Sequence, residues 1–256
     1  METIDAAKLA ESSIKIARHE DDVHAALATV VHDYFSLPAS VYLSMSLEEY
    51  RAVMLRAQSY LVESNFVPRI VNSIKPALED YLGTADFLVQ SNLYLRASRP
   101  NMPRHYENID WHRESFYGPN LEQSINIWTP IKGVTYKNSL RYIPRSHTIP
   151  DDKIITYNEG TSITLRYSTG HKLGFNYDPK VILSGVDLET AQTLMVPEKC
   201  SAIFSGNLIH GAAINLDSAI RFSVDFQVIR KADYSASNKK FHFSSGKPYF
   251  TSIENF

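Results

Sequence analysis

Apolar residues recur every three or four positions through the first third of the chain, between about residues 3 and 82. This spacing puts them on one face of a helix, so the region is predicted to be helical. The most regular stripe predicts a helix over residues 23–34. A less regular one predicts a first helix over residues 4–16. Another predicts a helix over 67–81, kinked at Pro76 and ending before Gly83.

Ser46 marks the start of a further predicted helix. Glu49 follows it by three residues, which is the pattern of a capping box. No linker rich in Gly, Ser or Pro separates this region from the rest, so it is predicted to pack onto the same domain. The stripe that would face the core comprises Tyr50, Val53, Met54, Ala57, Tyr60 and Leu61.

From about residue 87 the pattern changes to alternation, which is typical of strands. The strand over 219–229 is the clearest, and it places Arg221, Ser223 and Asp225 on one face. The tail after Tyr234 contains several aromatic residues and is predicted to wrap back over the domain. Further strands are predicted over 87–96, 124–129, 140–143, 154–156, 163–166, 181–183 and 201–204.

Helices followed by many short strands favour an all-β core, an antiparallel sandwich or barrel with helices packed outside. We expect a double-stranded β-helix (a jelly-roll or cupin-like fold) with flanking α-helices, in a single domain over residues 1–256. Residues 1–85 would be mainly helical support, residues 86–232 the core, and residues 233–256 a C-terminal tail.

Composition narrows the functional classes. The net charge of −2 gives no electrostatic reason to expect a nucleic acid or a membrane as partner. Cys200 is the only cysteine, which excludes an internal disulfide and fits a reducing compartment. No signal peptide and no apolar stretch near the ~20 residues of a membrane span are recognisable. We expect a cytoplasmic protein that acts on a small molecule, and a homo-oligomer remains open.

The residues that favour a specific chemistry are His112, Glu114, His210 and Arg221. On a strand, His112 and Glu114 would point to the same side. With His210 they would make the set of two histidines and one carboxylate that holds non-haem Fe(II) and leaves positions open. Arg221 could pair with a dicarboxylate through its planar guanidinium, and Ser223 could add a hydroxyl donor. A His-x-Glu pair alone is common by chance, so the order of the elements carries the argument.

At these residues the chain resembles the Fe(II)- and 2-oxoglutarate-dependent oxygenases, and among them the phytanoyl-CoA dioxygenase-like family. Residues 111–114 resemble the family's Trp-His-x-Asp segment, residues 126–131 the strand after it, and residues 138–147 its Asn-Gly-x-Leu-x-x-Ile-Pro-Gly-Ser-His turn. His210 and Arg221 match the distal histidine and the oxoglutarate-binding arginine. The resemblance covers roughly residues 87–228. Glu114 stands where the family usually has Asp, and Arg145 replaces a common Gly, which suggests a different turn conformation.

The resemblance implies a dioxygenase that oxidises, most simply hydroxylates, an unactivated C–H bond with release of succinate and CO2. Fe(II) would be held by His112, Glu114 and His210, with 2-oxoglutarate and O2 as cosubstrates and ascorbate as a stimulating reductant. The expected substrate is a small polar metabolite, a biosynthetic intermediate such as an amino acid or sugar derivative. The residues that would bind 2-oxoglutarate are Arg221, Ser223, Trp128 and Asn126.

The substrate residues are less clearly marked. Candidates are Tyr94, Arg96, Arg113, Lys172 and Asp225. The alternative is an exposed strand edge for Tyr94 and Arg96, and a strand end for Asp225. For Lys172 it is a solvated loop in place of a lid over the substrate.

Trp128 could equally be a core residue. Two other functions stay open: a cupin-like metal enzyme that does not use 2-oxoglutarate, and a non-catalytic binding domain on the same scaffold.

Overall fold

The computed structural model describes residues 6–103, 107–118, 121–158, 164–175, 179–234 and 247–256. Its helices are α1 (Ala6–Glu11), α2 (Asp21–Tyr34), α3 (Ala39–Ser44), α4 (Leu47–Glu63), α5 (Phe66–Ser73), α6 (Lys75–Leu82) and α8 (Thr169–Lys172). Its strands are β1 (Ile14–Arg18), β2 (Phe87–Gln90), β3 (Tyr94–Ser98), β4 (Ile125–Lys132), β5 (Leu140–Tyr142), β6 (Ile155–Asn158), β7 (Lys180–Ser184), β8 (Gln192–Thr193), β9 (Cys200–Ser205), β10 (His210–Ala212), β11 (Arg221–Arg230) and β12 (Phe250–Thr251).

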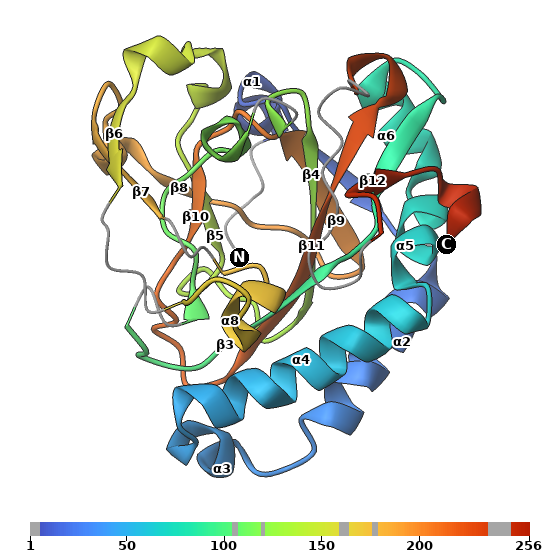
Figure 1. Ribbon diagram of the computed structural model, residues 1–256, viewed down its shortest axis with the longest axis vertical. Coiled ribbons are helices and arrows are strands. Elements are labelled where there is room, and N and C mark those ends of the chain that lie inside the picture. The colour runs from blue at the N-terminus through green and yellow to red at the C-terminus, as the bar shows by residue number, and fades with distance from the viewer. Residues whose placement is uncertain (1–5, 104–106, 119–120, 159–163, 176–178, 235–246) are drawn as a thin grey trace.

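The strands form an antiparallel core of two main sheets. The major sheet has the order β1-β9-β4-β11-β2-β12, and β3 pairs with β11 as well. The smaller sheet has the order β10-β5-β8, and β6 pairs with β7 in a separate ribbon. Helices α2, α4, α5 and α6 lie along one side of the molecule, on the major sheet (Figure 1). The expected β core with flanking helices is confirmed.

The alternation of apolar and polar residues along β11 gives the major sheet an apolar face towards the helices and a polar face on the other side. Phe222, Val224 and Phe226 belong to the large apolar cluster that includes residues of the helices. The intervening side chains, Arg221 and Asp225 among them, point to the other side of the sheet, because successive residues of a strand face opposite ways. There Trp128 and Phe204 of the major sheet pack with Leu140 and Tyr142 of the smaller sheet in a second apolar cluster.

The helical predictions are confirmed except at the N-terminus and near Pro76. The capping box of Ser46 and Glu49 is present at the start of α4. The expected helix over 4–16 is wrong in its second half: α1 ends at Glu11, and β1 pairs with β9. Ser13 has a φ of 56°, which interrupts the helix. The expected kinked helix over 67–81 is two helices, because Pro76 lies in the first turn of α6.

Three strand predictions need correction. The strand expected over 87–96 is divided into β2 and β3. The strand expected over 163–166 is absent for residues 164–166, and Ile163 lies outside the described residues. The prediction that the tail wraps back is supported by β12, which pairs with β2, although residues 235–246 lie outside the described part. In the described residues, no helix has the length and apolar character needed to cross a membrane.

Candidate metal centre

His112 and His210 face each other across a short antiparallel bridge. Each backbone N–H donates to the other residue's carbonyl at 2.9 Å. The two imidazole rings are 4.3 Å apart between centroids. His210 begins β10, so the smaller sheet fixes one histidine and, through the bridge, also fixes the other.

Glu114 reaches the histidines by a route that the sequence pattern does not predict. It begins a short 3-10 helix, Glu114–Tyr117, rather than continuing a strand with His112. Its backbone N–H donates to the Gly206 carbonyl at 2.8 Å. A Cβ on Gly206 would lie 2.6 Å from Ser124 Oγ and 3.1 Å from Glu114 Cγ, so only glycine allows this close approach.

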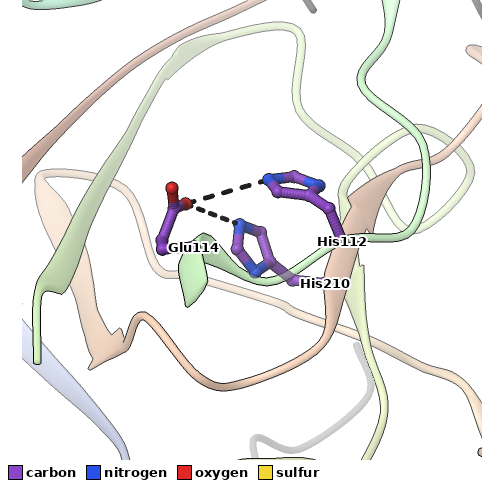
Figure 2. Close-up of side chains that lie close together, drawn as sticks. All are labelled: His112, Glu114 and His210. Carbon is purple, nitrogen blue, oxygen red and sulfur yellow. Dashed lines mark ion pairs between the residues drawn. The ribbon is translucent and has the colours of Figure 1, made fainter. Parts of the chain in front are cut away.

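The three side chains converge on one point, as Figure 2 shows. Glu114 Oε1 lies 3.8 Å from His112 Nε2 and 3.9 Å from His210 Nε2. One ligand atom from each residue lies within 4.8 Å of the others, and all three residues are buried. In the part of the chain that the structure describes, this is the group of histidine and carboxylate side chains that could hold a metal ion.

The opposite nitrogen of each imidazole is anchored. His112 Nδ1 lies 2.7 Å from the Asp110 carbonyl, and His210 Nδ1 lies 2.8 Å from the Leu208 carbonyl. A carbonyl only accepts, so each Nδ1 must carry the proton and donate it. Each Nε2 therefore presents its lone pair to the centre, which is the arrangement in which histidine ligates metals.

Burial shapes the charge of the centre. It lowers the pKa of His112 and lowers that of His210 to about 4, so both rings are neutral at pH 7. Their contacts with Glu114 are then not ion pairs. Burial also raises the pKa of Glu114, against the opposing effects of His210, Asn126 and Gln227. A buried carboxylate between two neutral imidazoles favours a cation at this point.

The centre opens into a cavity of about 800 Å³. His112, Glu114 and His210 line it together with Arg221, which is 2% exposed. The Arg221 Nη1 donates to the Asn138 carbonyl at 3.0 Å, whereas its Nε has no hydrogen-bond partner among the described residues. Burial lowers the pKa of Arg221 to about 10, so it stays cationic at neutral pH.

The other residues expected around the cosubstrate lie on the same side of the major sheet. Asn126 and Trp128 line the cavity from β4. Trp128 is also packed in the apolar cluster between the sheets, where it is a core residue; its contact with the cosubstrate stays a prediction. Ser223 is buried and its hydroxyl has no partner among the described residues, but it does not line the cavity.

The substrate candidates divide into two groups. Tyr94, Arg96 and Asp225 line the cavity. Arg96 and Asp225 form a two-pronged ion pair, with Nε to Oδ1 at 2.7 Å and Nη2 to Oδ2 at 3.0 Å, so Asp225 pairs with Arg96 and not with Arg221. Arg113 does not line the cavity, because its guanidinium donates to the Ile149 carbonyl and pairs with Asp151. Lys172 does not line it either; its neighbour His171 does.

Several lining residues were not expected. Gln227 could have been found, since it lies two residues beyond Asp225 on the same face of β11. Gln90 and Tyr249 lie at strand ends, and Phe116 and Tyr117 lie in the short 3-10 helix, where no spacing marks them. Arg145 has a φ of 58°, a left-handed conformation that glycine adopts more readily, so the turn keeps this conformation with an arginine.

Comparison with known proteins gives a clear answer for the fold. No protein-family model and no curated protein matches the sequence. A solved structure of EvdO2 from Micromonospora carbonacea var. aurantiaca, complexed with 2-oxoglutarate, is similar with a TM-score of 0.53 and 14% identity over 92% of this chain and 96% of that one.

Two further solved structures are similar. A non-heme monooxygenase, ThoJ, has a TM-score of 0.52 and 16% identity over 88% of this chain and 76% of that chain. SnoK, a non-heme alpha ketoglutarate dependent carbocyclase from nogalamycin biosynthesis, has a TM-score of 0.50 and 10% identity over 99% and 95%. At these low identities the structural similarity shows a shared fold, and the phytanoyl-CoA dioxygenase-like group is not confirmed.

Proposed function

We propose that the protein is an Fe(II)- and 2-oxoglutarate-dependent dioxygenase that oxidises a C–H bond of a small polar metabolite. The observation that carries the proposal is the placement of His112, Glu114 and His210 around one point of the cavity that Arg221 also lines. The similar structures support it, since EvdO2 was solved with 2-oxoglutarate and SnoK is described as dependent on it.

The donor set fits Fe(II). Two imidazole nitrogens and one carboxylate oxygen converge, each imidazole is held in the ligating tautomer, and Glu114 supplies one negative charge. Two histidines and one carboxylate are the typical ligands of non-haem Fe(II) oxygenases and leave coordination positions for cosubstrates. When bound, Fe(II) would supply the chemistry that activates O2 and 2-oxoglutarate for oxidation.

Arg221 fits the distal carboxylate of 2-oxoglutarate. It is a buried guanidinium, and the hydrogen bond that it makes within the described residues goes to the Asn138 carbonyl and not to a carboxylate. An anion that accepts from Nε would satisfy a donor that is otherwise buried without a partner. Ser223 is its neighbour on the inner face of β11. Trp128 and Asn126 line the cavity from β4 opposite Asp225 and Gln227, so they would border the cosubstrate towards the metal centre and not at Arg221.

The remaining groups of the chain would orient the reactants and exclude water. The carbonyls of Asp110 and Leu208 keep the His112 and His210 rings in place. The Arg96–Asp225 ion pair joins β3 to β11 beside the metal centre. Arg96 Nη1 also donates to the carbonyl of Leu173, the residue after α8, at 2.8 Å. These contacts would keep the wall of the cavity fixed while the reactants bind.

The test is consumption of 2-oxoglutarate by purified protein with Fe(II), ascorbate and O2, in the presence of a panel of candidate metabolites. We expect succinate to form with at least one compound, and the His210→Ala variant to form none. Glu122→Gln, at an exposed acidic position, is the matched control. Failure of the wild-type protein to form succinate with any compound would contradict the proposal.

A cupin-like metal enzyme that does not use 2-oxoglutarate is the second candidate, because the same three ligands would serve it. Anaerobic titration of the Fe(II) protein with 2-oxoglutarate separates the two. A weak visible charge-transfer band is expected if 2-oxoglutarate chelates the iron, and its absence would favour the second candidate.

A further inference from the structure

Two amides and two tyrosines form one wall of the cavity. Gln90 ends β2, Tyr94 begins β3, Gln227 lies on β11, and Tyr249 directly precedes β12. The Tyr249 hydroxyl donates to Gln227 Oε1 at 3.3 Å, and the Gln227 backbone N–H donates to Gln90 Oε1 at 2.9 Å. We call these four residues the amide–tyrosine wall.

The wall lies beside Glu114 and away from Arg221. Gln227 pairs with Asn126 on β4, and the preceding Ile125 pairs with Ser205, next to the Gly206 whose carbonyl accepts from the Glu114 N–H. Gln227 in turn lowers the pKa of Glu114. Arg221 lies six residues before Gln227 on the same face of β11, which corresponds to ~20 Å in a strand. A cosubstrate held by Arg221 would therefore leave the wall to a second molecule.

The wall offers neutral hydrogen-bonding groups. Burial raises the pKa of Tyr94 to about 12, so its hydroxyl stays protonated at neutral pH. Gln90 is 0% exposed, and its Nε2 has no hydrogen-bond partner among the described residues. A buried donor of this kind is unfavourable unless a ligand brings an acceptor to it.

The carboxylates that line the cavity apart from Glu114 already have partners. Asp225 is paired with Arg96, and Glu107 Oε1 lies 2.5 Å from Arg99 Nε. Two further cations line the cavity, Arg166 from the segment between β6 and β7 and Lys180 from the first position of β7, and neither belongs to the major sheet. They lie over aromatic rings: Lys180 is 5.9 Å from the centre of the Phe116 ring, and Arg166 is 5.1 Å from that of Tyr167.

We propose that the amide–tyrosine wall binds the substrate and selects a neutral polyhydroxylated molecule, such as a sugar ring. Hydroxyl groups both donate and accept, which matches amide and phenol groups. A free amino acid carries an ammonium and a carboxylate, and each would need an opposite charge that the wall does not offer. This inference rests on the proposed function, because it assigns Arg221 to the cosubstrate.

Calorimetric titration of the anaerobic protein, loaded with Fe(II) and 2-oxoglutarate, tests the proposal. The probes are methyl glycosides of common hexoses, glucuronic acid and glucosamine as charged analogues of the same ring, and free amino acids. We expect at least one glycoside to bind, and its charged analogues to bind roughly tenfold more weakly.

Variants of the wall should change this affinity. Tyr249→Phe and Gln90→Leu should each weaken glycoside binding about 3- to 10-fold, as expected for the loss of one hydrogen bond. Gln90→Glu keeps the shape of the side chain and adds a negative charge, so it should shift preference towards glucosamine. The matched controls, Tyr136→Phe and Gln123→Leu at exposed positions, should leave binding unchanged.

The outcomes separate this inference from the proposed function. Glycoside binding that depends on the wall, without any 2-oxoglutarate consumption, would support the wall and contradict the dioxygenase. Consumption of 2-oxoglutarate with no glycoside bound would overturn the wall alone. Tighter binding of amino acids or glucuronic acid, or unchanged glycoside affinity in Tyr249→Phe and Gln90→Leu, would also overturn it.

Discussion

His112 and His210 are neutral and present Nε2 as a metal ligand, because each ring is buried and hydrogen-bonded at Nδ1. Glu114 completes the set as a buried carboxylate whose pKa is raised by burial. The same burial that favours metal binding makes the carboxylate unfavourable when no cation is present. The buried charge of Glu114 would therefore favour metal binding but lower the stability of the metal-free protein.

Glu114→Gln should separate these demands. Removal of the buried charge should leave the melting temperature of the metal-free protein equal to or above that of the wild type. Fe(II) at about 100 times its Kd should stabilise the wild type by about 2.7 kcal/mol, because it binds only the folded state, and should not stabilise the variant. Anaerobic thermal unfolding with and without Fe(II) measures both effects. Equal stabilisation of both proteins by Fe(II) would contradict the assignment of Glu114.

The residue types at the centre could be identified from the sequence, but their geometry could not. His112, Glu114, His210 and Arg221 were found through a resemblance and a spacing argument that assumed a strand. The structure has a bridge and a 3-10 helix in its place. Tyr249 and Gln90 were missed because a side chain at a strand end has no periodic neighbour that marks the side it faces.

The element that organises the cavity is β11. Its outer residues pack under the helices, and its inner residues run from Arg221 past Asp225 to Gln227. Strict alternation over the eight residues 221–228 made this face predictable, since a one-residue shift would bury every charged side chain in the core. The shorter β8 and β10 were not predicted, because two or three residues are too few for alternation to be seen.

Arg221→Lys tests the end of β11 that is assigned to 2-oxoglutarate. Lysine keeps the charge but loses the paired donors of the guanidinium, so the KM for 2-oxoglutarate should rise about tenfold or more with a smaller change in kcat. Arg230→Lys, at the exposed other end of the strand, is the control. Steady-state succinate formation at varied 2-oxoglutarate gives both constants, and an unchanged KM in Arg221→Lys would count against the assignment.

The start of α4 gives a prediction on stability. Ser46 accepts from the Glu49 N–H, and the Glu49 carboxylate accepts from the Ser46 N–H at 2.9 Å. Ser46→Ala should cost about 1 kcal/mol, or roughly 2–4 °C in Tm for a chain of this size. Ser59→Ala, at an exposed position inside the same helix, should be neutral or slightly stabilising. Equal Tm changes for the two variants would show that the cap contributes nothing.

At the scale of the whole molecule, the helical layer and the β core share one large apolar cluster, so each buries apolar side chains of the other. Their arrangement was predictable in outline, because the hydrophobic period changes near residue 87. The pairing of β1 with β9 was not, since a strand of five residues after a helix resembles a continuation of that helix. His19 follows β1 and joins the layers: its Nδ1 lies 2.7 Å from Ser73 Oγ on α5 and its Nε2 lies 2.6 Å from Ser201 Oγ on β9.

Global stability should therefore depend on pH through His19. Burial, and secondarily His24, lower its pKa from 6.5 to about 4. In the unfolded chain His19 is protonated below about pH 6.5, whereas in the folded chain it is protonated only below about pH 4. The folded state is therefore destabilised relative to the unfolded state as the pH falls from 6.5 to 4. By linkage His19 accounts for about 2 kcal/mol of the loss between pH 7.5 and 5.

Urea unfolding at the two pH values measures this loss, and His19→Gln should reduce it by that amount. His32→Gln, which changes an exposed histidine on α2, is the control. Equal pH dependence in the wild type and His19→Gln would show that His19 is not held neutral between the layers.

The central claim is that three side chains of this chain hold one iron atom and that Arg221 anchors its cosubstrate. A crystal structure of the anaerobic complex with Fe(II) and 2-oxoglutarate, with anomalous data at the iron edge, tests it most directly. The account predicts one anomalous peak in contact with His112 Nε2, His210 Nε2 and a Glu114 carboxylate oxygen, with the distal carboxylate of 2-oxoglutarate on Arg221. A peak away from these three residues, or 2-oxoglutarate bound without Arg221, would contradict it.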